Sequence, residues 1–323
     1  MALVRNGRQV LSGVIASQVD THALYGGVVP EIASRMHVEA LDPLLELALE
    51  RAGVTLGDVD AVGVTYGPGL VGALLTGVSW AKALAYGLDV PIIPVNHIEG
   101  HVSANYIAHP DLEPPFVCLV ASGGHSHIMM VDRYGEYRLL GQTTDDAAGE
   151  AFDKVARVLD IPYPGGPLLD RLAEEGDEHA YRFPHPHTQG KYDFSFSGLK
   201  TAVINQAHNL RQQGIPIDAK NFAASFRRSV VDLLVEKTLA AALDTGAKRL
   251  AMAGGVAANS LLRRELVRRG EAKGLQVFIP PKALCTDNAE MIGAAAWYAL
   301  LSGALGRLDL NAVPALGMMT QTP

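Results

Sequence analysis

The sequence predicts an α/β protein with parallel or mixed sheets. Apolar segments typical of strands alternate with helical patterns along the 323 residues, and glycine turns follow two strands that read as buried. The length is enough for two ordinary domains, each with its own hydrophobic core. The proline-rich segment at residues 109–116 is the expected boundary between them.

The first elements are a strand and a helix. We expect a strand at residues 8–18 and an amphipathic helix within residues 38–53, because apolar residues recur there at helical spacing. Pro43 lies inside that window, so we expect the helix to start there, with Asp42 as its N-cap.

The apolar run at residues 70–88 is expected to be a buried helix. Its composition also resembles a membrane span, but Lys82 and three glycines interrupt it. A strand that ends in the Gly-Pro turn at residues 67–69 precedes this helix, and the strand "VPIIPVN" follows it.

The second half of the chain continues the alternation. Two apolar strands around a glycine pair predict a hairpin at residues 116–131. The remaining expected elements are a helix at 149–161, one or two long helices at 219–246, a strand, glycine turn and helix at 249–270, and a last helix at 288–303.

Charge and cysteine content exclude several classes of protein. With 27 basic and 34 acidic residues the net charge is -7, which argues against binding nucleic acid through bulk positive charge. Cys118 and Cys285 form no CxxC pattern, so a disulfide scaffold and a four-cysteine zinc site are excluded. Two distant cysteines fit a reducing cytoplasm, and we expect a cytoplasmic protein without a membrane anchor.

The segment "NHIEGH" raises the question of a metal site. If residues 96–104 are helical, His97 and His101 lie one turn apart on one face, a spacing that lets two imidazoles share an ion. In a zinc protease the glutamate directly follows the first histidine. Glu99 is two residues on, about 200° around the helix, and should point away from the metal. Two ordinary histidines on a helix remain the alternative, and Asp287 is either a third ligand or an N-cap.

Glycine turns favour a nucleotide as ligand. One follows the strand that leads into Ser122, and another includes Gly254 and opens a helix. Glycines there let backbone N–H groups approach a phosphate or ribose closely. A third glycine-rich turn, "PYPGGP", adds to the pattern, although none is a Walker loop or a GxGxxG fingerprint. Tight turns needed only for packing are the alternative.

The sequence resembles the tRNA adenosine threonylcarbamoyltransferase family of the bacterial TsaD type, once described as glycoproteases. The resemblance covers nearly the whole chain. Nine blocks carry it in order: "YGGVVPEIASRMH", "GPGLVGALLTG", "VNHIEGH", "ASGGHS", "DDAAGEAFDK", "YPGGP", "FSFSGLKT", "AGGVAAN" and "CTDNAEM".

The resemblance implies a fold and a reaction. The implied fold is that of the actin-like ATPase, sugar-kinase and Hsp70 class (ASKHA), with two RNase H-like domains around a nucleotide cleft. The domains would be residues 1–110, rejoined by a C-terminal helix at about 288–323, and residues 111–287. The reaction moves a threonylcarbamoyl group from threonylcarbamoyl-adenylate to N6 of the adenosine 3' of the anticodon, in tRNAs that read codons beginning with A, and releases AMP.

The resemblance also implies site residues and partners. The metal ligands would be His97, His101 and Asp287, with Fe²⁺ favoured and Zn²⁺ also suitable. The implied nucleotide-binding positions are Val120, Ala121, Ser122, Gly123, Gly124, Asp153, Gly166, Asp170 and Asn259. The implied partners are tRNA, a paralogous TsaB-type subunit and a small TsaE-type ATPase. No covalent nucleophile is expected.

The start of the chain departs from the family pattern. Members begin with a strand that carries a segment like "GIETSCDET", and we expect this strand, about fifteen residues with its turn, to be missing here. A misplaced start and a genuinely shortened protein both explain the departure. A shortened, non-catalytic scaffold subunit is therefore one alternative function, and a metallopeptidase is the other.

A local basic surface is needed if an acidic chain binds tRNA. Candidates are arginines of two predicted helices: Arg227, Arg228, Arg263, Arg264, Arg268 and Arg269. A solvated charged helix face explains them equally well.

Overall fold

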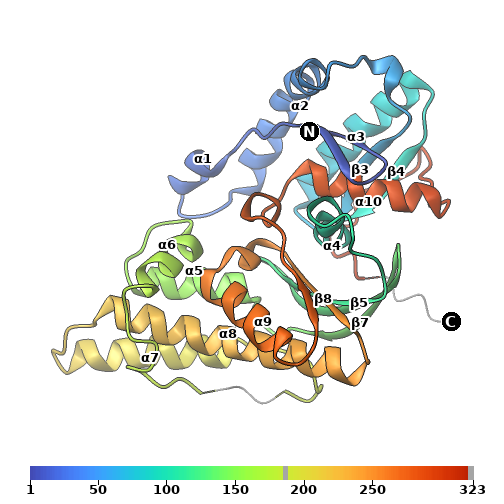
Figure 1. Cartoon of the computed structure of the whole chain (residues 1–323). Helices are drawn as coiled ribbons and strands as arrows, with labels where there is room; N and C mark the ends of the chain where they lie inside the picture. Colours follow the sequence, from blue (N-terminus) through green and yellow to red (C-terminus); the bar gives the residue numbers. More distant parts are fainter. Residues whose placement is uncertain (185–187, 319–323) are drawn as a thin grey trace. The chain divides into compact units, whose positions relative to one another are not determined.

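The structure, a computed structural model, describes residues 1–184 and 188–318 (Figure 1). Its internal contacts divide it into two units. Unit 1 comprises Met1–Pro114, Arg133–Tyr137 and the described part of Thr286–Pro323, and unit 2 comprises Pro115–Asp132 and Arg138–Cys285. Strands and helices occur in both, which confirms the α/β class.

Unit 1 contains two separate pairs of strands. β1 and β2 are antiparallel, whereas β3 and β4 are parallel. Helix α10 packs against strands of both pairs. In chain order the elements of unit 1 are β1 (Ala2–Arg5), β2 (Gln9–Gly13), α1 (Val19–Ala23), α2 (Pro30–Ala52), η1 (Leu56–Asp58), β3 (Val62–Gly67), α3 (Val71–Leu88), β4 (Ile92–Asn96), α4 (His97–Ala108) and α10 (Ala289–Leu301).

The first strand prediction was wrong in its bounds. A hairpin, β1 and β2, occupies residues 2–13, and residues 14–18 form no strand. Asn6 and Gly7 both have positive φ, 53° and 68°, at the turn. An Asn-Gly pair between strands is a strong sequence signal for a hairpin, and here it lies in a loop of three residues, 6–8, between the paired Arg5 and Gln9.

Helix α2 begins thirteen residues before the predicted start at Pro43. Pro30 occupies its first turn, where a missing N–H is harmless, and Pro43 lies inside the helix. Asp42 does not cap a helix; instead its Oδ1 accepts a hydrogen bond of 2.7 Å from Trp80 Nε1 on α3. Packing against α3 thus compensates for the backbone hydrogen bond that Pro43 removes.

Helix α3 is only partly buried, so the expectation of a buried helix was wrong. Its buried residues form one stripe at Leu74, Val78, Ala81 and Ala85. It is the one helix of the described residues that is long and apolar enough to cross a membrane, a weak criterion that core helices also satisfy. Large apolar side chains elsewhere on it are exposed, including Tyr86 at 75%.

Arg8 joins the β1–β2 hairpin to the end of α4. Its Nη1 donates to the carbonyls of Tyr106, His109 and Pro110, the last at 2.9 Å, and its Nη2 donates to Tyr134 Oη at 2.9 Å. A guanidinium at the C-terminal end of a helix satisfies open carbonyls and interacts favourably with the helix dipole. The hairpin therefore stabilises the helix that carries the two histidines.

Replacing Arg8 by methionine is expected to lower the free energy of unfolding by about 2–3 kcal/mol, because several charge-assisted hydrogen bonds are lost. Urea unfolding followed by circular dichroism measures this. Arg5→Met is the matched control, since Arg5 is an exposed arginine of the same hairpin. Equal, small effects of both substitutions contradict the capping role of Arg8.

Unit 2 is built on one five-stranded mixed sheet in the order β7-β6-β5-β8-β9. β5 pairs antiparallel with β6, as the predicted hairpin requires. On its other side β5 pairs parallel with β8. In chain order the elements are β5 (Phe116–Ala121), β6 (Ser126–Arg133), β7 (Glu136–Gln142), α5 (Ala148–Val158), α6 (Gly165–Ala173), α7 (Ser197–Gln212), α8 (Ala219–Asp244), β8 (Arg249–Ala253), η2 (Gly255–Ala258), α9 (Ser260–Glu271), β9 (Gln276–Phe278) and η3 (Lys282–Leu284).

The core of unit 2 lies between one face of the sheet and the helices. Helices α6 and α9 both pack against the long helix α8, whose buried residues extend along most of its length (Figure 1). Helix α8 ends just before Gly246, where φ is +70°, so the predicted stop is confirmed. Every residue of β5 is buried, which places the end of this strand, and the turn after it, on a rigid support.

Candidate metal centre and glycine turns

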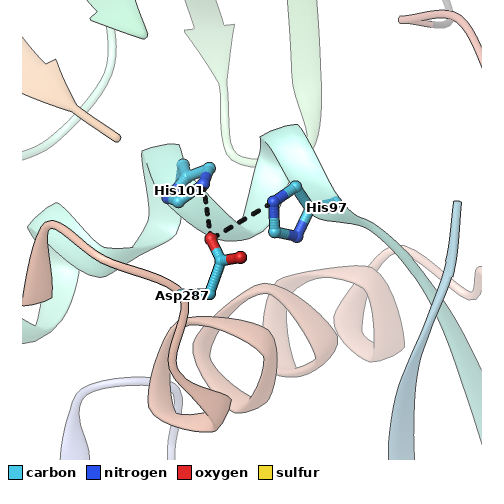
Figure 2. A group of neighbouring side chains, drawn as sticks. All are labelled: His97, His101 and Asp287. Carbon is cyan, nitrogen blue, oxygen red and sulfur yellow. Dashed lines mark ion pairs between the residues drawn. The ribbon is translucent and has the colours of Figure 1, made fainter. Parts of the chain in front are cut away.

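Helix α4 presents two histidines on one face. Asn96 caps the helix by accepting a hydrogen bond from the N–H of Ile98, and His97 and His101 follow at i and i+4, as predicted. Both rings turn toward Asp287, which immediately precedes α10 (Figure 2). Gly100 permits α4 to approach α10 closely, because an added Cβ there would lie 2.6 Å from Ile292 Cδ1.

Asp287 does not cap α10. The cap is the neighbouring Asn288, whose side chain accepts a hydrogen bond of 2.8 Å from the N–H of Met291. The Asp287 carboxylate lies instead next to the histidines, with Oδ1 3.4 Å from His97 Nε2 and 3.3 Å from His101 Nε2. The structure thus excludes the N-cap interpretation of Asp287 and places its carboxylate beside both histidines.

These distances fit a shared metal ion. In a tetrahedral site with bonds of about 2.0–2.1 Å, neighbouring ligand atoms lie about 3.3–3.4 Å apart. The three ligand atoms lie within 4.8 Å of one another. His101 is buried, yet neither of its ring nitrogens makes a hydrogen bond within the described residues. A bound cation would satisfy such a nitrogen, and two imidazoles with one carboxylate suit a divalent transition metal.

Glu99 is not part of this group. It lies on the same helix, two residues from each histidine, and burial raises its pKa to about 7. A zinc protease needs its general base beside the metal. The composition of the group therefore matches a metal site without the protease glutamate.

The turn after β5 is closed by its own hydrogen bonds. The N–H of Ser122 donates to the carbonyl of His125 at 2.7 Å, and Ser122 Oγ accepts from the N–H of His125 at 3.1 Å. Gly123 and Gly124, between them, are exposed, and an added Cβ would meet no atom within 4 Å. The backbone of this turn is therefore exposed at the two glycines, and the hydrogen bonds between Ser122 and His125 hold it in place. Val120 and Ala121, in the buried strand, contribute only backbone groups.

Two other turns approach this one. An added Cβ at Gly149, in the first turn of α5, would lie 2.6 Å from the carbonyl oxygen of Ser122. Gly254, at the end of β8, has φ of +88°, and its Cβ would lie 2.4 Å from the carbonyl oxygen of Ala121. Both positions therefore require glycine. The ends of two parallel strands and the start of a helix meet here, the usual place for a ligand in an α/β sheet.

Asp153 organises the start of α6. Its Oδ1 accepts hydrogen bonds of 3.1 Å from the N–H groups of both Gly165 and Gly166. Its Oδ2 accepts no hydrogen bond from the described residues. Asp153 and Gly166, two predicted binding positions, are thus adjacent, and one carboxylate oxygen is available to a ligand.

Asp170 and Asn259 meet at the start of α9. Asn259 caps this helix by accepting from the N–H of Leu262 at 3.0 Å. The next residue, Ser260, donates its N–H to Asp170 Oδ2 and its hydroxyl to Asp170 Oδ1, both at 3.0 Å. Sequence reasoning missed Ser260, because a serine after an N-cap has no distinctive motif.

The arginines proposed to contact tRNA are largely neutralised. Arg228 and Arg269 pair with Asp232, and Arg268 pairs with Glu265. Arg263 donates to the carbonyls of Ala257 and Pro280. This surface of α8 and α9 therefore has little free positive charge, and the interpretation as a charged helix face fits it better.

His127 is a half-buried histidine on the strand after the Ser122 turn. It lies on β6 opposite Val120, and its Nδ1 has no hydrogen-bond partner among the described residues. Burial, reinforced by His125, lowers the pKa of His127 to about 4. An ordinary histidine in the unfolded chain binds a proton near pH 6.5. Stability is therefore lost as the pH falls below about 6.5 toward about 4, since only the unfolded state gains the proton.

The free energy of unfolding should fall between about pH 7.5 and about pH 5. In His127→Gln this fall should be smaller by about 1–2 kcal/mol. Urea unfolding at the two pH values measures the difference. His179→Gln is the control, because the His179 side chain is 76% exposed and should leave the pH dependence unchanged. If His127→Gln retains the full pH dependence, another group is responsible for it.

Comparison with known proteins decides the family. The model of the TsaD family, tRNA N6-adenosine threonylcarbamoyltransferase, matches residues 9–294. The chain belongs to this family. Proteins of that name from Clostridium botulinum strain 657 and Clostridium perfringens strain SM101 are each 54% identical to it over 316 residues, 98% of this chain and 93% of theirs. Membership of the TsaD family makes the chain a transferase that modifies tRNA and disfavours both the metallopeptidase and the scaffold.

Solved structures support the fold class. HypF from T. kodakarensis superposes with a TM-score of 0.62 and 16% sequence identity. The match covers 83% of this chain and 44% of the HypF chain. Component A of (R)-2-hydroxyglutaryl-CoA dehydratase from Acidaminococcus fermentans matches 94% and 93% with a TM-score of 0.50 and 14% identity. At such identities the likeness shows the fold alone, which is ASKHA-like, as the family resemblance implied.

Proposed function

We propose that this chain transfers the threonylcarbamoyl group of threonylcarbamoyl-adenylate to N6 of the adenosine 3' of the anticodon, in tRNAs that read codons beginning with A. The observation that carries the proposal is the family match, with 54% identity to named transferases over 98% of the chain. The amine nitrogen forms a bond to the carbamoyl carbon and loses a proton, while the bond from that carbon to the phosphate oxygen breaks and AMP leaves.

Unit 2 is the proposed binding site for the adenylate. The open backbone at Gly123 and Gly124 accommodates the phosphate, since N–H groups in a fixed turn are preorganised donors. Asp153 Oδ2 and the Asp170 carboxylate are acceptors for ribose hydroxyls. Asn259 uses its carbonyl oxygen as a cap, which leaves its amide N–H groups as donors to the ligand.

The proposed metal ligands are His97, His101 and Asp287, which would hold one divalent cation, Fe²⁺ by preference or Zn²⁺. When bound, such an ion supplies Lewis-acid stabilisation of negative charge on substrate oxygens. The residues' own contribution is a fixed geometry: α4 places the two rings one turn apart, and the Asn288 cap fixes the backbone next to Asp287.

Direct transfer, without a covalent enzyme intermediate, agrees with the state of the two cysteines. Cys118 is fully buried in β5, and burial raises the pKa of its thiol far above neutrality. Burial also raises the pKa of Cys285. A thiol is nucleophilic only as the thiolate, so neither residue is suited to attack the carbamoyl carbon. Trapping an acyl-enzyme on Cys118 or Ser122 would contradict direct transfer.

A TsaB-type subunit and a small TsaE-type ATPase are the proposed partners, in the cytoplasm. Helix α3 supports a protein partner for unit 1, because three of its large side chains are exposed: Val71 at 54%, Leu75 at 41% and Tyr86 at 75%. Exposed apolar side chains that gather on one helix are a feature of protein interaction sites. The paired arginines of α8 and α9 make another surface the better candidate for tRNA.

We also propose that the two units are RNase H-like domains and that the sheet of unit 1 lacks a strand. In unit 2, β5 lies between an antiparallel neighbour, β6, and a parallel one, β8. In unit 1 the antiparallel pair β1–β2 and the parallel pair β3–β4 have no strand between them within residues 1–184 and 188–318. A central strand equivalent to β5 would join the two pairs into one sheet of the same order.

The test is reconstitution of the reaction. The metal-loaded protein, the two partner proteins, threonylcarbamoyl-adenylate and an unmodified tRNA transcript are incubated, and nucleosides from the digested tRNA are measured by mass spectrometry. We expect threonylcarbamoyl-adenosine and an equal amount of AMP. AMP without modified tRNA contradicts the transferase proposal, as does the absence of both products when a related enzyme works under the same conditions.

A further inference from the structure

Arg227 is a buried cation that the proposed mechanism does not use. It lies on α8 and is 3% exposed. Its Nη1 donates to three side chains: Asp170 Oδ1 at 2.9 Å, Glu174 Oε1 at 2.6 Å and Ser260 Oγ at 3.2 Å. Its Nη2 donates to the carbonyl of Ala173 at 3.2 Å. A buried guanidinium is stable only when it is paired and hydrogen-bonded in this way.

The contacts of Asp170 leave an acceptor site on Oδ2 of its carboxylate. A carboxylate has about four lone-pair sites, two on each oxygen. Oδ1 accepts from Arg227 Nη1 at 2.9 Å and lies 3.0 Å from Ser260 Oγ, whose single proton is also within reach of Glu174 Oε1 at 2.5 Å. Oδ2 accepts from the N–H of Ser260 within the described residues and has one site left. The side chain is 13% exposed, so the carboxylate is not fully buried.

We propose that Arg227 and Ser260 are positioning residues that fix the Asp170 carboxylate so that the free acceptor site on its Oδ2 takes one hydroxyl of the donor ribose. This inference rests on the proposed function, in which Asp170 binds the adenylate. Without the guanidinium, the carboxylate can rotate about its side-chain torsions, and its hydrogen bond to the hydroxyl becomes weaker on average.

Glu174 adds a reason for a cation at this place. The hydroxyl of Ser260 and the guanidinium of Arg227 lower the pKa of Glu174 to about 2, so it is ionised at neutral pH. Two carboxylates, on Asp170 and Glu174, therefore share one buried guanidinium. Arg264 also contacts Glu174, at 3.2 Å, but its side chain is 55% exposed. Arg264 thus provides a matched arginine that touches the cluster without touching Asp170.

The experiment compares the affinity of the full chain for AMP, 2'-deoxy-AMP and 3'-deoxy-AMP by calorimetry. We expect the unmodified protein to bind one of the deoxy compounds about tenfold more weakly than AMP, because a hydrogen bond to a charged acceptor is lost. In Arg227→Met this ratio should fall to about twofold or less, mainly through weaker AMP binding. In Arg264→Met it should stay at the value of the unmodified protein.

The outcomes separate this inference from the proposed function. If the unmodified protein binds AMP but prefers it over neither deoxy compound, the assignment of Asp170 to the ribose is wrong and the inference fails with it. If the preference exists and Arg227→Met retains it at an unchanged melting temperature, the positioning role of Arg227 is overturned while the donor site stands.

A second pair of variants covers loss of folding in Arg227→Met. Arg227→Met combined with Glu174→Gln removes the carboxylate that would be left without its buried partner. Ser260→Ala removes the hydroxyl that contacts Asp170, Glu174 and Arg227, and it keeps the backbone N–H that donates to Asp170 Oδ2. Each is expected to lower the preference for AMP by at least about threefold. If Ser260→Ala keeps the full preference for AMP over the deoxy compound, the inference is overturned. This holds whether or not the double variant folds.

Discussion

Replacing His101 by alanine is expected to weaken metal binding by at least about 100-fold and to reduce tRNA modification by a similar factor. The site offers three protein ligands, and removal of one leaves an imidazole and a carboxylate. Two ligands hold a divalent cation far less tightly than three. Metal content after reconstitution with Fe²⁺ or Zn²⁺ and removal of excess ion, measured by mass spectrometry, gives the first readout, and the tRNA assay gives the second.

Folding must be separated from metal binding in this experiment. His101 is 1% exposed, so alanine there also creates a cavity next to α10. Asp287→Asn avoids this, because the Asp287 side chain is 78% exposed and the substitution changes its charge but not its size. His208→Ala, at an exposed histidine of α7, is the control and should leave both readouts unchanged. Full metal content in both His101→Ala and Asp287→Asn would rule out this site.

The proposed metal site shows what a local pattern can predict. The spacing of His97 and His101 fixes their relative positions as soon as the segment is helical, and the structure shows that Asn96 caps this helix. Asp287 lies 186 positions after His101, and no local pattern joins them. The sequence left Asp287 as either a ligand or an N-cap, and the resemblance to the family implied the ligand. The structure adds the physical reason: Asn288 takes the capping role, so Asp287 is not used as a cap.

Other features depended on contacts between distant elements. The start of α2 was misjudged because Pro43 normally ends a helix, whereas packing on α3 and the hydrogen bond from Trp80 to Asp42 maintain this one. Arg227 appeared as a possible tRNA contact because its sequence neighbours are also charged. Its partners, Asp170 and Ser260, come from two other helices, so only the fold reveals a buried network.

A second large effect is expected from Gly123→Val, which should weaken AMP binding on the order of 100-fold while stability changes by no more than about 0.5 kcal/mol. The physical basis is the open space at this position, where an added Cβ meets no atom within 4 Å. The folded chain therefore tolerates a side chain. A bound phosphate does not, because the valine would keep it from the backbone N–H groups of the turn.

A neighbouring glycine supplies the contrast. Gly149→Ala should destabilise the protein by roughly 1–3 kcal/mol, since its Cβ would lie 2.6 Å from the Ser122 carbonyl oxygen and backbone would have to move. Gly87→Ala, at an open position in α3, should weaken neither AMP binding nor the stability of the fold. Calorimetry with AMP and thermal unfolding distinguish the three variants. If Gly123→Val binds AMP with unchanged affinity, the turn after β5 has only a structural role and the phosphate of the donor binds elsewhere.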